Sequence, residues 1–139
     1  LDVGESAAGG IRRALERLHS AGIRTSLFID PEPEVVRRSA DLGPTAVELH
    51  TGEYANARDA AAIAKQLERL RAATELAREL GLAVHAGHGL TYENVMPVAG
   101  IPGCEELNIG HSVISRSVLV GIERSVREMK ELLLRAAGG

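Results

Sequence analysis

Short apolar segments alternate with longer amphipathic segments along the whole chain. Three apolar segments, at residues 23–30, 45–50 and 82–86, are rich in aliphatic and β-branched side chains and predict buried strands. A turn and a fourth strand are predicted within residues 101–109. Between these strands, apolar residues recur at the three- and four-residue spacing of a helix. Strands that alternate with helices form a parallel sheet, so the pattern predicts an α/β fold.

The clearest helix is predicted over residues 59–80. Its apolar residues share one face, with charges opposite: Ile63, Leu67, Leu70, Ala73, Ala77 and Leu80. A last helix is predicted after a break at Gly121. Its apolar face would carry Ile122, Val126, Met129 and Leu133.

Glycines and an Asp-Pro pair mark the predicted helix ends. Three glycines follow amphipathic segments where helices commonly end: Gly22, Gly43 and Gly81. Asp30 is placed to cap the following helix, with Pro31 in its first position. Residues 51–56 are expected to form a loop.

Two architectures fit four parallel strands: a doubly wound open sheet, or part of a (β/α)8 barrel. No Gly-x-Gly-x-x-Gly or P-loop motif follows a strand, which weakens the nucleotide-binding open sheet. A complete barrel needs ~250 residues, so 139 residues would form about half of one. The chain begins without methionine in a stretch rich in glycine and alanine, as the middle of a longer protein would. We therefore expect residues 1–139 to be half of a single barrel domain.

Composition removes several classes of function. A net charge of −3 and only 2% aromatic residues are poorly suited to binding nucleic acid, which favours a basic face or stacking aromatics. No apolar run approaches the ~18 residues that would suggest a membrane span. The single cysteine, Cys104, allows no internal disulfide, suits the reducing cytoplasm, and is expected to be a small filler before a strand.

Polar side chains gather where the predicted strands end. Asp30 follows the first strand, and three further strand ends carry residues 48–52, 85–89 and 108–112. Four of the five histidines fall in the last three places. In parallel α/β folds the carboxyl ends of the strands carry the functional site. This clustering predicts a site there.

The residues at these ends suggest proton transfer and anion binding. Alternation along a strand puts Glu48 and His50 on one side of the sheet. Glycines around His88 and His111 let main-chain N–H groups approach a ligand closely. Gly110 and His111 also begin a helix, whose free N–H groups and dipole favour a phosphate.

Each candidate also has a structural reading. Asp30 is most simply a helix cap, Glu48 an ion-pair partner, and His50 and His85 hydrogen-bonded residues of a barrel wall. Glu48, His85 and His88 could form a two-His, one-carboxylate metal site. The spacing is not diagnostic, and the glycines favour an anion over a metal. Weaker candidates for the mouth of the site are Tyr54, Asn56 and Tyr92. No serine lies in a nucleophile elbow, which counts against a Ser/His/Asp hydrolase.

Four blocks of sequence carry a resemblance to a known family. These blocks are SLFIDPEPE, VELHTGEYA, AGHGLTYENV and EELNIGHSVISRSVLVGIERSVREMKELL. In this order they resemble the pyridoxine 5′-phosphate synthases of vitamin B6 biosynthesis. The likeness runs from about Leu1 to the C-terminus.

The resemblance implies a fold and a reaction. The family forms a (β/α)8 TIM barrel, of which this chain would be the C-terminal half, strands five to eight. Its members condense 3-amino-2-oxopropyl phosphate with 1-deoxy-D-xylulose 5-phosphate, releasing phosphate and water, and use no metal or organic cofactor. They are typically homo-oligomers. The catalytic residues of the family's first four strands are not in this chain, so it is expected to be inactive alone.

The resemblance also assigns roles to individual residues. Glu48 in VELHTG matches a glutamate that stabilises the transition state, and His88 in AGHGL matches a proton donor. Gly89, Gly110 and His111 match the site for the amino-ketone substrate and its phosphate. Two alternatives remain: a non-catalytic phosphate-binding half-barrel, and another phosphosugar-handling barrel such as an isomerase or aldolase. The lack of a lysine at the strand ends counts against a Schiff-base aldolase.

Overall fold

Four parallel strands form the centre of the molecule. The computed structural model describes residues 3–138. The strands are β1 (Ser26–Ile29), β2 (Ala46–His50), β3 (Ala83–Gly87) and β4 (Cys104–Asn108). They pair in sequence order, β1-β2-β3-β4, and every pair is parallel. The predicted α/β fold with a parallel sheet is therefore confirmed.

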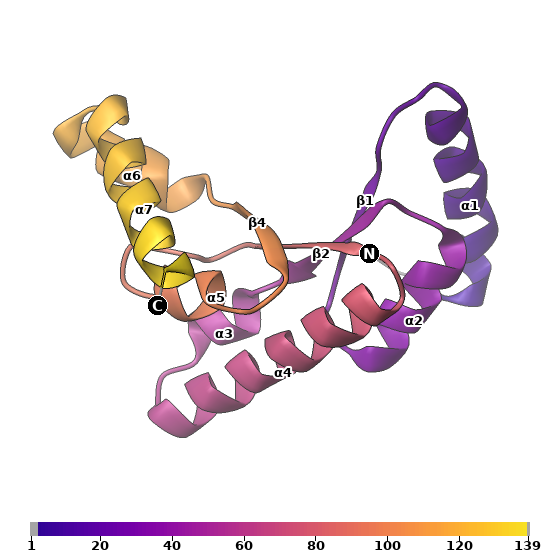
Figure 1. Cartoon of the computed structure of the whole chain (residues 1–139), viewed down its shortest axis with the longest axis horizontal. Helices are drawn as coiled ribbons and strands as arrows, with labels where there is room; N and C mark the ends of the chain where they lie inside the picture. The colour runs from indigo at the N-terminus through magenta and orange to yellow at the C-terminus, as the bar shows by residue number, and fades with distance from the viewer. Residues whose placement is uncertain (1–2, 139) are drawn as a thin grey trace.

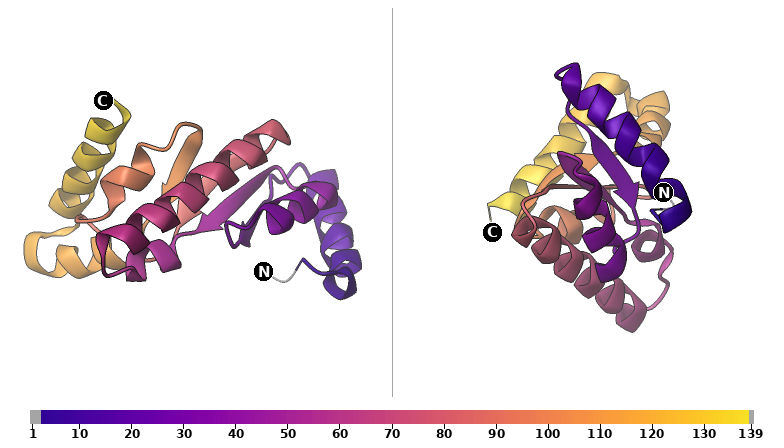
Figure 2. Two further views of the ribbon diagram at one scale, coloured as in Figure 1. Left: turned by 90° about the horizontal axis from the view of Figure 1, so that it is seen from below. Right: turned by 90° about the vertical axis from the view of Figure 1, so that its right-hand side faces the viewer.

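Helices precede the first strand, connect each strand to the next and follow the last strand. They are α1 (Glu5–Ser20), α2 (Pro33–Leu42), α3 (Gly52–Asn56), α4 (Ala60–Glu79), α5 (Val95–Ala99), α6 (His111–Val120) and α7 (Ile122–Ala137). Helix α4 contacts β2 and β3 and lies along the sheet, while α1 and α7 lie at opposite ends of the molecule (Figures 1 and 2). Gly43 ends α2 in the left-handed conformation, and Gly121 separates α6 from α7, as the sequence predicts.

One face of the sheet packs against the helices. Its residues alternate along the strands and are buried: Leu27, Ile29, Val47, Leu49, Val84 and Ala86. They meet buried residues of α2 and α4, among them Val36, Leu70, Ala73 and Ala77. Each large aliphatic side chain buried in this way contributes about 1.5–3 kcal/mol. This layer is the hydrophobic core, and it fixes the positions of the strand ends.

The other face of the sheet carries a row of mainly polar residues. Phe28 pairs with Glu48, Glu48 with His85, and His85 with Glu106, so their side chains point to the same side. These side chains are half-buried or exposed. Glu48 thus lies on the face away from the helices, as alternation along its strand predicts.

Two local predictions were wrong. Helix α2 begins at Pro33, not Pro31, and its N-cap residue is Glu32, so Asp30 is not the cap. The reason is that a residue before proline avoids the helical region, and Glu32 is accordingly extended. Residues 52–56, expected to be loop, form the short helix α3, which buries Tyr54.

The last two helices expose more apolar surface than expected. Of the face predicted for α7, Met129 is buried, but Ile122 and Val126 are 54% and 41% exposed. In α6, Val118 and Leu119 are more than four-fifths exposed. The described residues contain no helix that combines the length and apolar character needed to cross a membrane.

Candidate functional site

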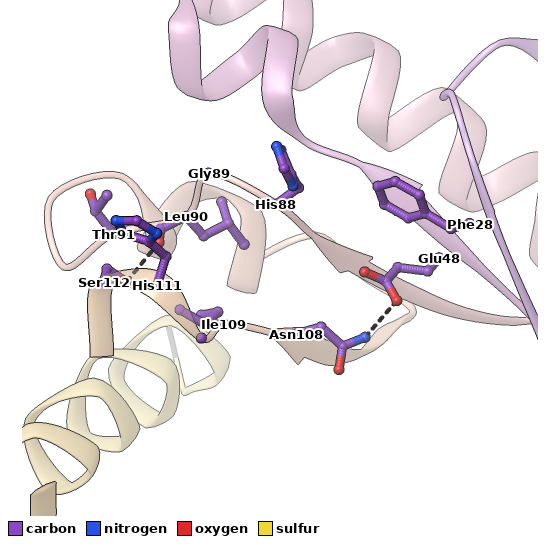
Figure 3. Close-up of a pocket in the computed structure, with 11 residues that line it drawn as sticks. Phe28, Glu48, His88, Gly89, Leu90, Thr91, Asn108, Ile109, His111 and Ser112 are labelled. Atoms are coloured by element: carbon purple, nitrogen blue, oxygen red, sulfur yellow. Dashed lines mark hydrogen bonds between the residues drawn. The ribbon is translucent and has the colours of Figure 1, made fainter. Parts of the chain in front are cut away.

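A cavity of about 490 Å³ lies at the carboxyl ends of the strands. It opens between the ends of β1, β2 and β4 on one side and the start of α6 on the other (Figure 3). Its lining residues come from β1, from β2, from the loop after β3, and from the end of β4 and the segment after it: Phe28, Glu48, His88, Gly89, Leu90, Thr91, Asn108, Ile109, Gly110, His111 and Ser112. The cavity is thus built where parallel α/β folds carry their sites.

Glu48 supplies the acidic group of the cavity. Its Oε2 accepts a hydrogen bond of 2.8 Å from Nδ2 of Asn108, the last residue of β4 (Figure 3). Gly87 lies beneath this pair. A Cβ atom added there would come within 2.5 Å of Oε1 of Glu48. The carboxylate can therefore take this place only because position 87 has no side chain.

His88 has an unusual backbone conformation. Its φ is +83°, and no other non-glycine residue of the described part of the chain has a positive φ. This conformation costs about 1–3 kcal/mol for a residue with a side chain. Thr51, which is fully buried, hydrogen-bonds to the carbonyl groups of Gly87 and His88 and holds the strained segment. Strain of this kind is concentrated at functional positions.

Three rings cluster at the carboxyl end of β2. The His50 and His88 rings are 4.8 Å apart between centroids, and Phe28 meets the His50 ring edge-on at 5.2 Å. Nδ1 of His50 lies 3.5 Å from a carboxylate oxygen of Asp30. Gly52 packs so closely that a Cβ there would be 2.7 Å from the His50 ring. His50 contacts the His88 ring but is not among the residues that line the cavity.

The loop after His88 is held by Asn94. Its Oδ1 accepts a hydrogen bond from the Thr91 amide, its Nδ2 donates to the Gly89 carbonyl, and its own carbonyl accepts from the Tyr54 hydroxyl. Gly89 has φ +80°, and a Cβ there would be 2.7 Å from that of Ala55. Position 89 therefore requires glycine on two grounds.

The start of α6 forms the opposite wall. Gly110 precedes the helix, and His111 and Ser112 occupy its first two positions. The Ser112 hydroxyl donates to the Leu90 carbonyl at 2.8 Å, which joins this wall to the loop after β3. The first N–H groups of a helix have no partner within it and carry its positive dipole end. This wall is suited to an anionic group.

The five residues to which the resemblance assigns roles all line this one cavity: Glu48, His88, Gly89, Gly110 and His111. His85 does not. It lines a smaller hollow nearer the other end of the strands, with Arg24 and Glu106. The hydroxyls of Tyr54 and Tyr92 bond to the backbone of residues 94 and 125, and Asn56 is also outside the cavity lining.

Sequence reasoning missed the apolar part of the lining and the partner of Glu48. Phe28 and Leu90 carry no chemical signal in the sequence, because such residues are ordinarily core residues. Asn108 lies within a polar strand end, but nothing in the sequence connects it to Glu48. In the described residues no three His, Cys, Asp or Glu side chains are grouped to hold a metal ion, so Glu48, His85 and His88 do not form the metal site considered above.

Comparison with known proteins shows the family to which this chain belongs. The family model described as pyridoxal phosphate biosynthesis protein PdxJ matches residues 1–135. A pyridoxine 5′-phosphate synthase of Trichlorobacter lovleyi is 52% identical over 126 residues, which are 91% of this chain and 53% of that protein. Those of Synechococcus sp. and Synechocystis sp. are 54% and 53% identical over 88% and 94% of this chain, and 52% and 55% of their own lengths. The chain spans about half the length of these curated relatives.

Proposed function

Because this chain belongs to the PdxJ family of pyridoxal phosphate biosynthesis proteins, we propose that it supplies the C-terminal half of a pyridoxine 5′-phosphate synthase. The observation that carries this proposal is the single cavity lined by all five residues that match the family's motifs. These residues come from three strand ends up to 63 positions apart, Glu48 to His111. The fold has brought them together.

The proposed architecture is strands five to eight of a (β/α)8 barrel. The sheet order follows the sequence, one face packs on helices, and the other face carries the polar row. A groove of about 360 Å³ also lies between α1 and β1, lined by apolar residues such as Ile11, Leu15 and Leu27. A right-handed crossover lays its helix over the two strands it joins. A parallel strand preceding α1 would therefore pair with the free edge of β1 and cover this groove.

The proposed reaction joins 3-amino-2-oxopropyl phosphate to 1-deoxy-D-xylulose 5-phosphate and releases phosphate and water. The phosphate of the amino-ketone binds to the first N–H groups of α6, beside Gly89. Fixed main-chain donors then orient the reacting carbon and nitrogen atoms, which lowers the entropic barrier to condensation. Ile109 and Leu90 give the bound substrate apolar contacts on the same side of the cavity.

His88 and Glu48 carry out different parts of this reaction. His88 donates a proton to the hydroxyl that leaves as water, because an imidazole can hold and give up a proton near neutral pH. The Glu48 carboxylate stabilises the positive charge that develops when the amine and a ketone form an imine. Neither step routes through a metal or an organic cofactor.

The same proposal places the protein in the cytoplasm as a homo-oligomer. The free thiol of Cys104 is compatible with a reducing compartment. The exposed apolar residues Val118 and Leu119 on α6 provide a surface for contact with another subunit.

The test is product formation by the full-length protein that carries this chain. Both phosphorylated substrates are supplied, and pyridoxine 5′-phosphate is followed by its fluorescence. We expect product from the natural protein and a loss of roughly 10²- to 10⁴-fold in kcat for His88→Ala. His19→Ala is the matched control, because His19 lies on α1 and bonds to Thr25 outside the cavity. Its kcat should be little changed.

Two outcomes would overturn the proposed reaction, and a third would overturn the role of His88. A folded protein that makes no product but binds inorganic phosphate would favour the non-catalytic phosphate-binding half-barrel. A protein that instead isomerises or cleaves 1-deoxy-D-xylulose 5-phosphate would favour another class of barrel enzyme. Equal losses for His88→Ala and His19→Ala would remove the role of His88.

A further inference from the structure

We propose that Asn108 is a positioning residue for Glu48, acting across Gly87. The proposal rests on the function proposed above, because it assigns Glu48 a task in the same reaction. Its direct observation is the hydrogen bond of 2.8 Å from Nδ2 of Asn108 to Oε2 of Glu48. Figure 3 shows the two side chains reaching toward each other over the end of the sheet.

The bond spans three strands. Glu48 is in β2 and Asn108 ends β4, and β3 lies between these strands. Next-nearest strands of a sheet are roughly 9–10 Å apart. A direct bond between their side chains therefore requires both to lean over the middle strand. At that point β3 has Gly87, where a Cβ would lie 2.5 Å from Oε1 of Glu48 and 3.1 Å from Cβ of Asn108.

A register shift in β4 puts Asn108 on the correct face. Val84 pairs with Cys104, but the next residue, His85, pairs with Glu106, so one extra residue is inserted in β4. If the pairing continued from Val84 and Cys104 without the shift, Leu107 would lie beside Gly87 and Asn108 would point toward the helices. With the shift, Asn108 pairs with Gly87 and faces the cavity. Bulges of this kind commonly redirect a side chain next to a functional site.

The consequence for Glu48 is a fixed carboxylate. A flexible glutamate side chain at a cavity wall can adopt several rotamers, and most of them would carry its charge away from the substrate. The amide donor of Asn108 selects one of these rotamers before the substrate binds. A charge that is already in place stabilises a transition state without a cost of reorganisation. Asn108 should therefore affect the rate more than substrate binding.

A double-mutant cycle tests whether Asn108 acts through Glu48. In the full-length protein, Asn108→Ala should lower kcat roughly 10- to 100-fold, the range expected for loss of a hydrogen bond to a charged group. KM for the amino-ketone phosphate should change much less. In a Glu48→Ala background, the same substitution should change kcat by no more than roughly twofold. Equal losses of kcat in the two backgrounds would overturn the proposal.

Two further variants guard against a purely structural explanation. Asn108→Asp keeps the shape of the side chain and replaces the donor with a second carboxylate, so its kcat should fall at least as far as that of Asn108→Ala. Gly87→Ala should also lower kcat, because its Cβ would displace the Glu48 carboxylate. Gly10→Ala is the matched control, since a Cβ at that position of α1 meets nothing within 4 Å. Natural kcat in Asn108→Asp would contradict the proposal.

Crystal structures separate this proposal from the function on which it rests. If the natural protein makes no pyridoxine 5′-phosphate, the proposed function fails, but the position of Glu48 can still be compared between the natural protein and Asn108→Ala. We expect the Glu48 carboxylate to leave its place above Gly87 in the variant. An unchanged Glu48 rotamer would show that Asn108 does not position it.

Discussion

The hydroxyl oxygen of Thr51 lies 2.5 Å from the carbonyl oxygen of His88. The same hydroxyl is 2.7 Å from the Gly87 carbonyl, which also accepts the Thr51 amide at 2.9 Å. Thr51 is fully buried at the end of β2, so it joins the ends of two strands inside the core. These bonds hold the backbone of His88 in its positive-φ conformation, and this conformation places the His88 ring at the cavity.

Because the backbone of His88 is strained, two substitutions of this residue should differ in stability although both lose activity. His88→Gly should be about 1–2 kcal/mol more stable than His88→Ala, because only glycine adopts a left-handed conformation without a steric cost. Both variants should lose activity to the same extent, since both lack the imidazole. Urea denaturation of the two variants measures the difference in stability. Equal free energies of unfolding would show that position 88 is not strained.

Removal of the buried Thr51 hydroxyl should lower the stability of the fold. Thr51→Val keeps the size and branching of the side chain but leaves the carbonyl groups of Gly87 and His88 with one donor fewer. The Gly87 carbonyl keeps the Thr51 amide as a donor, so the free energy of unfolding should fall by about 0.5–1.5 kcal/mol, the net contribution of a hydrogen bond. Thr45→Val makes the same change at the other end of β2, and its free energy of unfolding serves as the comparison. A Thr51→Val variant as stable as the natural protein would contradict the role given to this hydroxyl.

The hydrogen bonds of Glu128 should make part of the stability of the fold depend on acid pH. It accepts hydrogen bonds from Arg116 of α6 and from Arg124 of α7, and these bonds, that of Arg116 first, lower the pKa of Glu128 from 4.5 to about 2. Because its pKa is lower in the folded state, Glu128 stabilises the fold above about pH 4.5. This contribution is lost as the pH falls toward about 2.

The measurement for Glu128 is urea denaturation at a series of pH values. Glu128→Gln should lose less stability than the natural protein between about pH 5 and pH 2, because its side chain does not titrate. Glu75→Gln, a change at an exposed position of α4, should follow the natural curve. An acid dependence in Glu128→Gln equal to that of the natural protein would contradict the assignment.

Cys104 is predicted to be unreactive in the folded protein. Burial raises the pKa of its thiol from 9.0 to about 11, so at pH 8 it holds roughly a hundredfold less thiolate than an ordinary cysteine. Iodoacetamide should therefore alkylate Cys104 slowly in the native state and rapidly in urea, because the thiolate is the reactive form. Mass spectrometry over time follows the reaction. Alkylation at the same rate in both states would show an accessible, ordinary thiol.

Much of the fold is predictable because its signals are local. Gly43 ends α2 with a φ of +82°, a conformation in which glycine has no steric cost. Asp30 is not the helix cap because two local signals compete after it. Two prolines, Pro31 and Pro33, compete for the helix start, and the second prevents Glu32 from being helical. The conformational restriction on the residue before Pro33 is itself local, so the start of α2 is encoded in the sequence.

The site was only partly predictable, because its geometry depends on contacts between strands. Alternation within β2 places Glu48 on the cavity face without any knowledge of the neighbouring strands. Asn108 is different, because strict alternation along β4 from Cys104 would turn it toward the helices. The register shift that reverses it is a property of the pairing with β3. Phe28 joins the lining for a similar reason, since only the register sets it beside Glu48.

The most direct test of the central claim is a crystal structure of the full-length protein with 3-amino-2-oxopropyl phosphate. We expect the phosphate within hydrogen-bond distance of the main-chain N–H groups of Gly110 and His111. The carbon chain should then lie between His88 and Glu48, in the cavity at the strand ends. A substrate bound elsewhere, with its phosphate away from the start of α6, would contradict the account of this site.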